Sequence, residues 1–314
     1  MAVALAQSTF PIAHCALERR PPPAPSPSES YVKHANEQPA RLAQPRKLLV
    51  LVDLNGTLLY RPRLDKAGQR RREHILRPGA RELISYLFDN HAVMVYTSAT
   101  RRNAVPCVDA LLKHLAPAQR SQLIGIHPRE QLGLTRAQLN AKVQVYKPLE
   151  PVWKLKAVQA SAKRPGCGAW DVSNTVLLDD SVEKARANPH SLLQVPEFKL
   201  ADDATQATSL AANTMKAEAA IMQRVQARLE QLKWEVSVPR RIRIWQEQKT
   251  TLVDRPDDDT FAAAAAAAYP TPEATPEIMP EATPEATPET EPVERHPPLP
   301  LQEPRSGPGM TTRN

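Results

Sequence analysis

Three apolar stretches of the chain end on short polar side chains that could do chemistry together. LLVLVD ends on Asp53, VMVYT ends on Thr97, and NTVLLDD ends on the pair Asp179 and Asp180. If these stretches are parallel strands of one sheet, their carboxyl ends meet at the edge where open α/β sheets hold their ligands. An aspartate at the end of a single strand usually belongs to a turn or caps a helix, but three such strand ends together favour a common crevice.

Carboxylates gathered in one crevice repel one another unless a cation lies between them. Oxygen ligands of this kind suit Mg²⁺. With such an ion in place, Asp53 could attack a phosphorus atom and carry the phosphoryl group as an aspartyl-phosphate. The transition state of that step is anionic, so a lysine is expected nearby. Lys147, in VQVYKPLE, stands between an extended run and a helix, although its spacing alone favours an ordinary surface lysine.

The elements that must position these residues alternate between strand and helix patterns. Apolar runs typical of strands cover residues 46–53, 91–97, 121–126, 174–180 and 191–195. Helical patterns cover residues 78–90, 101–115, 149–161 and 205–234, and residues 239–249 fit either a helix or a strand packed on the domain. This alternation predicts an α/β fold with a mostly parallel sheet and flanking helices.

The composition divides the chain into three parts. Residues 1–45 contain PPPAPSPS and show no periodicity, so we expect a disordered N-terminal arm. Residues 46–250 hold the strand and helix patterns and are expected to fold as one domain. Residues 251–314 are expected to form a disordered Pro-, Ala- and Glu-rich tail. Their TPEA-type array places proline at every fourth residue, which forbids helix and sheet.

Charge is unevenly distributed along the chain. Residues 48–253 carry 31 basic and 19 acidic side chains, whereas residues 254–314 carry 4 basic and 12 acidic ones. A basic body favours anionic partners such as phosphoproteins or nucleic acid. The spacing of the three cysteines predicts neither a zinc site nor a disulfide framework. No apolar run approaches the ~18–20 residues of a membrane span, and the first residues make a weak mitochondrial presequence.

Four blocks of the sequence resemble, in order, the four motifs of the haloacid dehalogenase superfamily: VDLNGTL, VMVYTSAT, QVYKPLEPVW and NTVLLDDSVEKA. More narrowly, residues 46–235 resemble the NLI-interacting-factor family, which includes the phosphatases of the RNA polymerase II C-terminal domain. LRPGARELISYLFDN and LLDDSVEKARANPHSLLQVPEF strengthen the likeness. The resemblance implies a Rossmann-like haloacid dehalogenase fold. The folded region leaves little length for a large cap, which predicts an open crevice.

The resemblance also implies a role for each motif residue. Asp53 would be the nucleophile and a Mg²⁺ ligand, and Thr97 would bind phosphate. Lys147 would neutralise the phosphoryl oxygens. Asp180 would be a further metal ligand, with Asp179 beside it. The expected cofactor is therefore Mg²⁺.

Asn55 departs from the family pattern D-x-D-x-T, in which aspartate stands at this position. That aspartate protonates the leaving group and later activates water. An amide cannot exchange a proton at neutral pH, and loss of a general acid/base typically costs ~10²–10⁴ in rate. The resemblance implies that Asn55 still offers Mg²⁺ its main-chain carbonyl. Because Asn-Gly favours tight turns, Asn55 and Gly56 also predict a turn with a positive φ.

Three functions remain open at this point. The first is a Mg²⁺-dependent phosphatase for phosphoserine or phosphothreonine in flexible protein segments, weakened or inactive because of Asn55. The alternative is a non-catalytic protein-binding module similar to the presequence-receptor subunit of the mitochondrial inner-membrane translocase, although that subunit carries a membrane span. The third is a scaffold that works through its Pro-rich ends.

The expected partner is a phosphoprotein or a flexible peptide segment, rather than nucleic acid bound directly. The acidic Thr-Pro tail could also fold back onto the basic body and occupy the crevice, because Thr-Pro resembles the substrates of the family. An inert solubilising tail is the simpler interpretation. The compartment stays open, with nucleus or cytoplasm favoured and the mitochondrion as the alternative.

Overall fold

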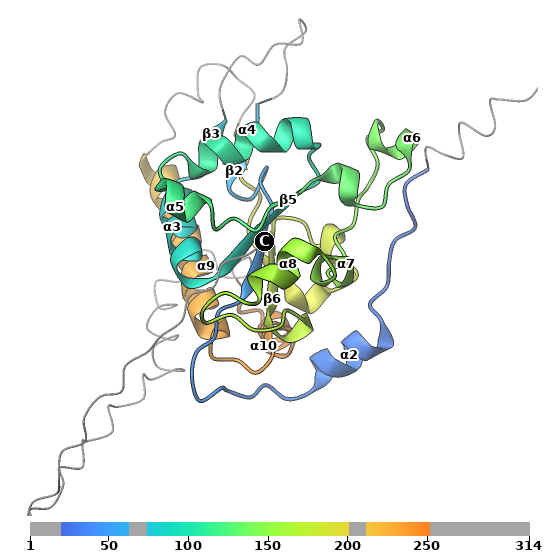
Figure 1. The fold of residues 1–314 in the computed structure, drawn as a ribbon, viewed down its shortest axis with the longest axis vertical. Helices are drawn as coiled ribbons and strands as arrows, with labels where there is room; N and C mark the ends of the chain where they lie inside the picture. Colours follow the sequence, from blue (N-terminus) through green and yellow to red (C-terminus); the bar gives the residue numbers. More distant parts are fainter. Residues whose placement is uncertain (1–19, 63–73, 201–211, 252–314) are drawn as a thin grey trace, which may run out of the picture. The chain divides into compact units, whose positions relative to one another are not determined.

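The centre of the molecule is a five-stranded parallel sheet with strand order β5-β4-β1-β6-β7 (Figure 1). The structure is a computed structural model that describes residues 20–62, 74–200 and 212–251. The strands of this sheet are β1 (Leu49–Val52), β4 (Ala92–Tyr96), β5 (Ile126–His127), β6 (Thr175–Asp179) and β7 (Leu192–Gln194). The mostly parallel sheet with flanking helices is confirmed.

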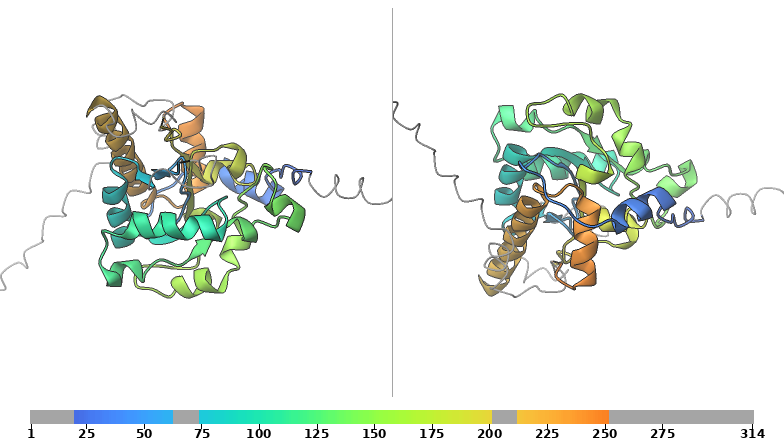
Figure 2. Two further views of the ribbon diagram at one scale, coloured as in Figure 1. Left: turned by 90° about the horizontal axis from the view of Figure 1, so that it is seen from above. Right: turned by 90° about the horizontal axis from the view of Figure 1, so that it is seen from below.

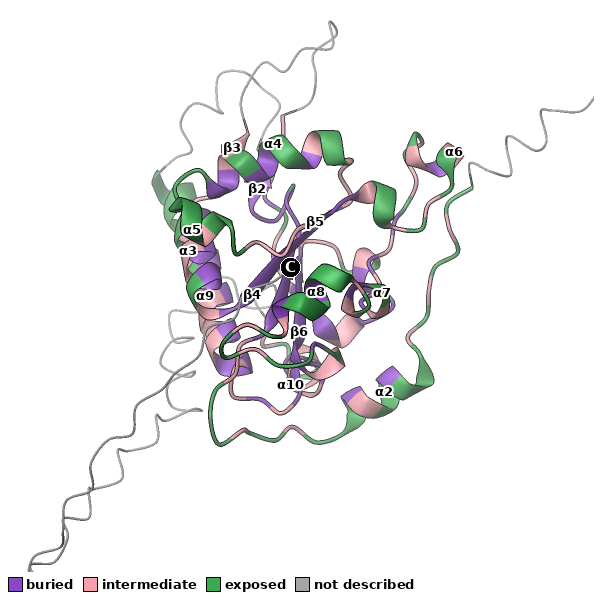
Figure 3. Cartoon of the chain, viewed as in Figure 1, coloured by how far each residue is buried: buried purple, intermediate pink, exposed green. Residues whose placement is uncertain are grey.

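Strand β1 has apolar residues on both faces because helices cover both sides of the sheet. Val50 and Val52 belong to a core that includes residues of α3, α4, α9 and α10. Leu49 and Leu51 belong to a second core with residues of α7 and α8. Figure 3 shows the central strands in the colour of buried residues. An uninterrupted apolar run therefore leads to Asp53.

The helices differ in length and in what they cover. Figures 1 and 2 show α3 and α9 side by side on one face of the sheet. The α-helices of the described residues are α2 (Glu29–Asn36), α3 (Ala80–Asn90), α4 (Arg101–Leu112), α5 (Pro117–Arg120), α6 (Arg136–Leu139), α7 (Glu150–Trp153), α8 (Lys156–Ser161), α9 (Ala212–Leu232) and α10 (Val238–Glu247).

Helix α3 begins at Ala80, two residues after the expected start at Pro78. Gly79 has a φ of 81°, which keeps it out of the right-handed helix. A Cβ at Gly79 would lie 3.0 Å from the Cβ of Met222 and 3.1 Å from the Cα of Ala219, both on α9. The glycine therefore allows α9 to pack closely on the beginning of α3.

Two predicted elements are shorter than the sequence suggested. The helix expected over residues 149–161 is divided into α7 and α8 because the backbone of Leu155 is extended. The strand expected over 121–126 forms ladder pairs only at Ile126 and His127. The predicted helix 205–234 is present as α9 within the described residues, and residues 239–249, which had two interpretations, form most of α10.

Helix α2 lies in the N-terminal segment that we expected to be disordered, so that prediction is wrong for residues 29–36. Ser28 caps the helix by accepting a hydrogen bond from the N–H of Tyr31 at 3.2 Å. Tyr31 and Ala35, four residues apart, are buried. Arg243 of α10 donates to the carbonyl of Ala35 at 2.9 Å, and Figure 2 shows the two helices side by side. The apolar pair and the cap together explain the helix.

A short antiparallel hairpin, β2 (Leu59–Tyr60) with β3 (Ile75–Leu76), was not predicted. The expectations for residues 1–19 and for the tail from residue 252 on lie outside the described residues, and so does the contact proposed between tail and crevice. Among the described residues, no helix has the length and apolarity to cross a bilayer.

Candidate active site

The carboxyl ends of β1 and β6 bring Asp53 and Asp179 together. Val52 of β1 lies opposite Leu178 of β6, and the N–H of Asp53 donates to the carbonyl of Leu178 at 2.9 Å. Asp53 and Asp179 are buried, and Asp180 is half-buried. One carboxylate oxygen of each of the three aspartates lies within 4.8 Å of the other two. The structure thus gathers the three acids at one edge of the sheet, while their roles stay predictions.

Lys147 lies inside this group of acids. Its side chain is fully buried, and its Nζ is 2.9 Å from Oδ1 of Asp53 and 2.5 Å from Oδ2 of Asp179. The interpretation of Lys147 as an ordinary surface lysine is therefore wrong. The ammonium supplies the positive charge that two buried carboxylates require. The ammonium of Lys147 also lies beside the carboxylate of Asp53, the expected nucleophile.

Lys184 is a second lysine in this group of acids, and no role was assigned to it from the sequence. Its Nζ lies 3.1 Å from Asp53, 2.9 Å from Asp179 and 3.1 Å from Asp180. Burial is the largest influence on its pKa and lowers it, but the three carboxylates together outweigh burial, so the pKa of Lys184 is raised. Its spacing of four residues from Asp180 was the available signal.

The donor set fits a hard divalent cation such as Mg²⁺. All three acids offer carboxylate oxygens. Oδ1 of Asp53 is buried, and the ammonium of Lys147 lies 2.9 Å from it. Two oxygens bound to Mg²⁺ are at most about 4.2 Å apart, so oxygens within 4.8 Å of one another need only a small contraction. Asp53 and Asp180 would hold the ion, with Asp179 beside them.

The loop after β1 carries Asn55 at the surface of the domain. Asn55 is exposed, and its Oδ1 accepts a hydrogen bond from the N–H of Arg61 at 2.7 Å. Gly56 has a φ of 88°, which confirms the predicted turn. A Cβ at Gly56 would lie 2.9 Å from Oδ2 of Asp180. The glycine therefore allows the loop to pass close to the third carboxylate.

Thr97 follows β4 at the same edge of the sheet. It is buried, and its Oγ1 accepts a hydrogen bond from the N–H of Ala99 at 3.2 Å. Its own N–H donates to the carbonyl of His127 on the next strand at 3.0 Å. The hydroxyl group thus holds the turn after β4, and its predicted role as a phosphate ligand is not tested by these contacts.

Arg77 supports the loop after β1 and was also missed from the sequence, although it stands in LRPGARELISYLFDN. It is buried, and it donates to the carbonyl of Thr57 at 3.0 Å and to Glu218 of α9 at 2.7 Å. Its guanidinium lies 5.6 Å from the ring centre of Phe198, whose N–H donates to the carbonyl of Gly56 at 2.7 Å. Helix α9 thus holds the loop that carries Asn55.

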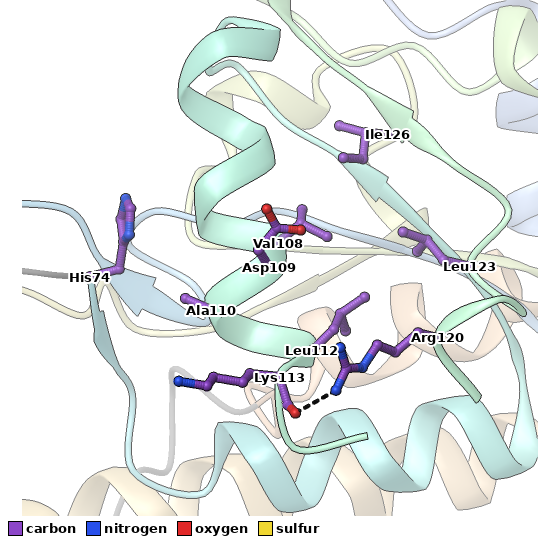
Figure 4. Close-up of a pocket in the computed structure, with 9 residues that line it drawn as sticks. All are labelled: His74, Val108, Asp109, Ala110, Leu112, Lys113, Arg120, Leu123 and Ile126. Carbon is purple, nitrogen blue, oxygen red and sulfur yellow. Dashed lines mark hydrogen bonds between the residues drawn. The ribbon is translucent and has the colours of Figure 1, made fainter. Parts of the chain in front are cut away.

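A separate hollow of about 730 Å³ lies between α4, α5 and β5 (Figure 4). Val108 and Ile126 line it, and the guanidinium of Arg120, which also lines it, donates to the carbonyl of Lys113. Its lining residues include neither the three clustered aspartates nor Lys147 and Lys184, so this hollow is separate from the carboxylate group.

The acids and lysines at the carboxyl edge of the parallel sheet come from three of the four sequence blocks, an arrangement typical of a phosphatase domain of the haloacid dehalogenase superfamily. Residues 47–222 match the family described as NLI interacting factor-like phosphatase, and the chain belongs to this family. An uncharacterized FCP1 homology domain-containing protein of Schizosaccharomyces pombe is 35% identical over 179 residues, which are 56% of this chain and 70% of the relative.

Two solved structures are more distantly similar. One is Fcp1, an essential RNA polymerase II CTD phosphatase, with 15% identity and a TM-score of 0.33, over 69% of this chain and 56% of that one. The other is a variant of fission yeast Fcp1 bound to beryllium fluoride, with 12% identity and a TM-score of 0.31, over 70% of this chain and 61% of that one. The chain thus spans less than two thirds of both proteins. At these TM-scores neither bears on the details of the site.

Proposed function

We propose that the domain binds phosphoserine or phosphothreonine in flexible protein segments and removes the phosphate slowly, through an aspartyl-phosphate on Asp53. The observation that carries this proposal is the buried carboxylate of Asp53, 2.9 Å from the ammonium of Lys147. A buried acid held beside a fixed positive charge suits a nucleophile that must stay ionised and meet an anionic group.

The residues of the chain divide the work of such a reaction. An oxygen of Asp53 forms a bond to phosphorus while the bond from phosphorus to the serine or threonine oxygen breaks. Lys147 stabilises the negative charge on the phosphoryl oxygens, and the hydroxyl of Thr97 would donate to one of them. Mg²⁺, when bound, would supply further positive charge at the same oxygens. Water then hydrolyses the aspartyl-phosphate.

Asn55 limits both steps of this reaction, the formation of the aspartyl-phosphate and its hydrolysis. The alkoxide that leaves from serine or threonine needs a proton, and water needs a base to take one from it. An amide can do neither at neutral pH. An aryl phosphate has a much better leaving group and depends less on the acid. Attack on an aryl phosphate should therefore be faster than hydrolysis of the aspartyl-phosphate that it forms.

A non-catalytic binding module is the alternative, and Asn55 is the observation that favours it. The acids and lysines of the crevice are in place, whereas the proton-transfer residue is replaced. Such a module would use the crevice to hold a phosphorylated or acidic segment without turnover. Protein import, as suggested by the resemblance to the mitochondrial presequence receptor, is one setting for such a module.

A pre-steady-state assay separates the two functions. Wild type and Asp53→Asn are mixed with p-nitrophenyl phosphate and Mg²⁺, and each protein is also titrated with a phosphothreonine peptide by calorimetry. The phosphatase predicts a stoichiometric burst of nitrophenol from wild type, which is lost in Asp53→Asn. Peptide binding by both proteins without a burst would support the binding module. The absence of both the burst and peptide binding would contradict both functions.

A further inference from the structure

Lys184 has a position in the crevice that the proposed phosphatase chemistry does not explain. Its Nζ contacts one oxygen of each of the three acids, at 3.1 Å from Asp53, 2.9 Å from Asp179 and 3.1 Å from Asp180. Lys147, by contrast, forms ion pairs with Asp53 and Asp179. Lys184 is thus the lysine that pairs with both Asp53 and Asp180, the two acids that would hold a divalent ion, as well as with Asp179.

We propose that the ammonium of Lys184 is a built-in counter-cation that occupies the position of the divalent ion, so that Lys184 and Mg²⁺ exclude each other from the crevice. This inference rests on the proposed magnesium site. It adds a residue that sets the metal affinity of the site.

Distance supports the exclusion. An ion held at ~2.0–2.1 Å from oxygens of Asp53 and Asp180 must lie between these two acids. The ammonium of Lys184 already lies 3.1 Å from an oxygen of each of them. Two cations at so short a separation repel strongly in a partly buried site. Mg²⁺ can therefore bind only after the ammonium of Lys184 has moved away.

Formal charge supports an exchange rather than an addition. The three carboxylates carry three negative charges, and the two ammonium groups carry two positive ones. Exchange of the Lys184 ammonium for Mg²⁺ makes the group neutral. Addition of Mg²⁺ with both lysines in place would leave a net positive charge in a buried site, which is unfavourable until an anion arrives.

Solvent access shows which lysine can move. The side chains of Lys147 and Asp179 are fully buried, whereas those of Lys184 and Asp180 are 15% and 13% exposed. The main chain of Lys184 is fixed, because its carbonyl accepts a hydrogen bond from the N–H of Lys147 at 2.7 Å. Rotation of the Lys184 side chain toward solvent would therefore open the cation position without moving the loop.

The first test uses the unmodified sequence. The full-length protein is titrated with Mg²⁺, and an amine-reactive acetylating reagent followed by peptide mass spectrometry reports the reactivity of each lysine. We expect the acetylation of Lys184 to rise severalfold, with the same midpoint as Mg²⁺ binding measured by calorimetry, while Lys147 stays unreactive. Mg²⁺ binding with unchanged or reduced acetylation of Lys184 would overturn the inference and leave the magnesium site intact.

The second test uses variants. Lys184→Met keeps the length of the side chain and removes its charge, so its Mg²⁺ affinity should exceed that of wild type about tenfold or more. Lys199→Met is the matched control, because the substitution removes the same charge from a lysine that is exposed and pairs with Glu197. Equal affinities in wild type and Lys184→Met, or an equal gain in both variants, would overturn the inference. No Mg²⁺ binding by any of the proteins would instead reject the magnesium site itself.

Discussion

The two ends of strand β1 hold buried polar groups in opposite ways. At its carboxyl end, Asp53 is buried among charged side chains and pairs with Lys147 and Lys184. At its amino end, His91 is buried, and no acidic side chain of the described residues forms an ion pair with it. The N–H of Leu48 donates to Nδ1 of His91 at 3.3 Å. The same central strand is therefore anchored by ions at one end and by a neutral ring at the other.

The ring of His91 is neutral because burial removes it from water. Burial, together with smaller effects of Lys233 and Lys47, lowers the pKa of His91 to about 3. Because Nδ1 accepts from Leu48, the proton of the neutral ring lies on Nε2, which donates to the hydroxyl of Tyr86 at 3.0 Å. A second proton on Nδ1 would face the N–H of Leu48. The comparison shows that burial preserves charge only where a counter-charge is buried too.

The largest expected effect comes from removing a counter-charge at the charged end. Lys147→Met leaves the buried acids Asp53 and Asp179 short of one positive charge and should lower the free energy of unfolding by about 3–5 kcal/mol. Urea denaturation measures this loss. The control is Lys113→Met on the surface of the domain, which should change stability by less than about 0.5 kcal/mol. Similar stabilities of the two variants would show that the buried carboxylates of Asp53 and Asp179 do not need the ammonium of Lys147.

A smaller effect is expected at the neutral end. His91→Phe keeps a ring in the core but leaves the N–H of Leu48 without its acceptor, which should cost about 1–3 kcal/mol. Tyr86→Phe is the control, because it removes only the hydroxyl at the other side of the ring. If His91→Phe were as stable as wild type in urea denaturation, the hydrogen bond at the start of β1 would contribute nothing to the free energy of unfolding.

The pH dependence of stability sharpens the comparison further. The unfolded chain protonates histidine near pH 6.5, whereas folded His91 stays neutral down to about pH 3. The contribution of His91 is therefore fully present above pH 6.5 and is lost as the pH falls toward 3. Between pH 6.5 and 5 the loss is up to about 2 kcal/mol. Urea denaturation at both pH values should show a smaller loss in His91→Phe, and an equal loss would contradict the assignment.

The sequence was informative where local pattern decides position. Asp53 and Asp179 each end an apolar run, and the pairing of parallel strands brings such ends together whatever the details of the loops. Gly56 follows Asn55, and that pair predicts its own turn. These residues could be placed because strand period and turn chemistry act over a few neighbouring positions.

The rest depends on contacts between distant parts of the chain. The burial of Lys147 is set by Asp53 and Asp179, so its spacing could not distinguish it from a surface lysine. Lys184 reaches the acids only because of the turn after β6. Helix α2 depends on the contact of Tyr31 with the body of the domain, and the Pro-rich sequence before it hides the pattern. Neither propensity nor periodicity contains such information.

The proposal that Asn55 limits turnover at this site has one direct test. Phosphate release from a phosphothreonine peptide is measured with saturating Mg²⁺ for wild type, Asn55→Asp and the double variant Asp53→Asn/Asn55→Asp. The proposal predicts that Asn55→Asp is faster than wild type by ~10²–10⁴ and that the double variant is inactive. No gain in Asn55→Asp, with Mg²⁺ binding confirmed by calorimetry, would contradict it.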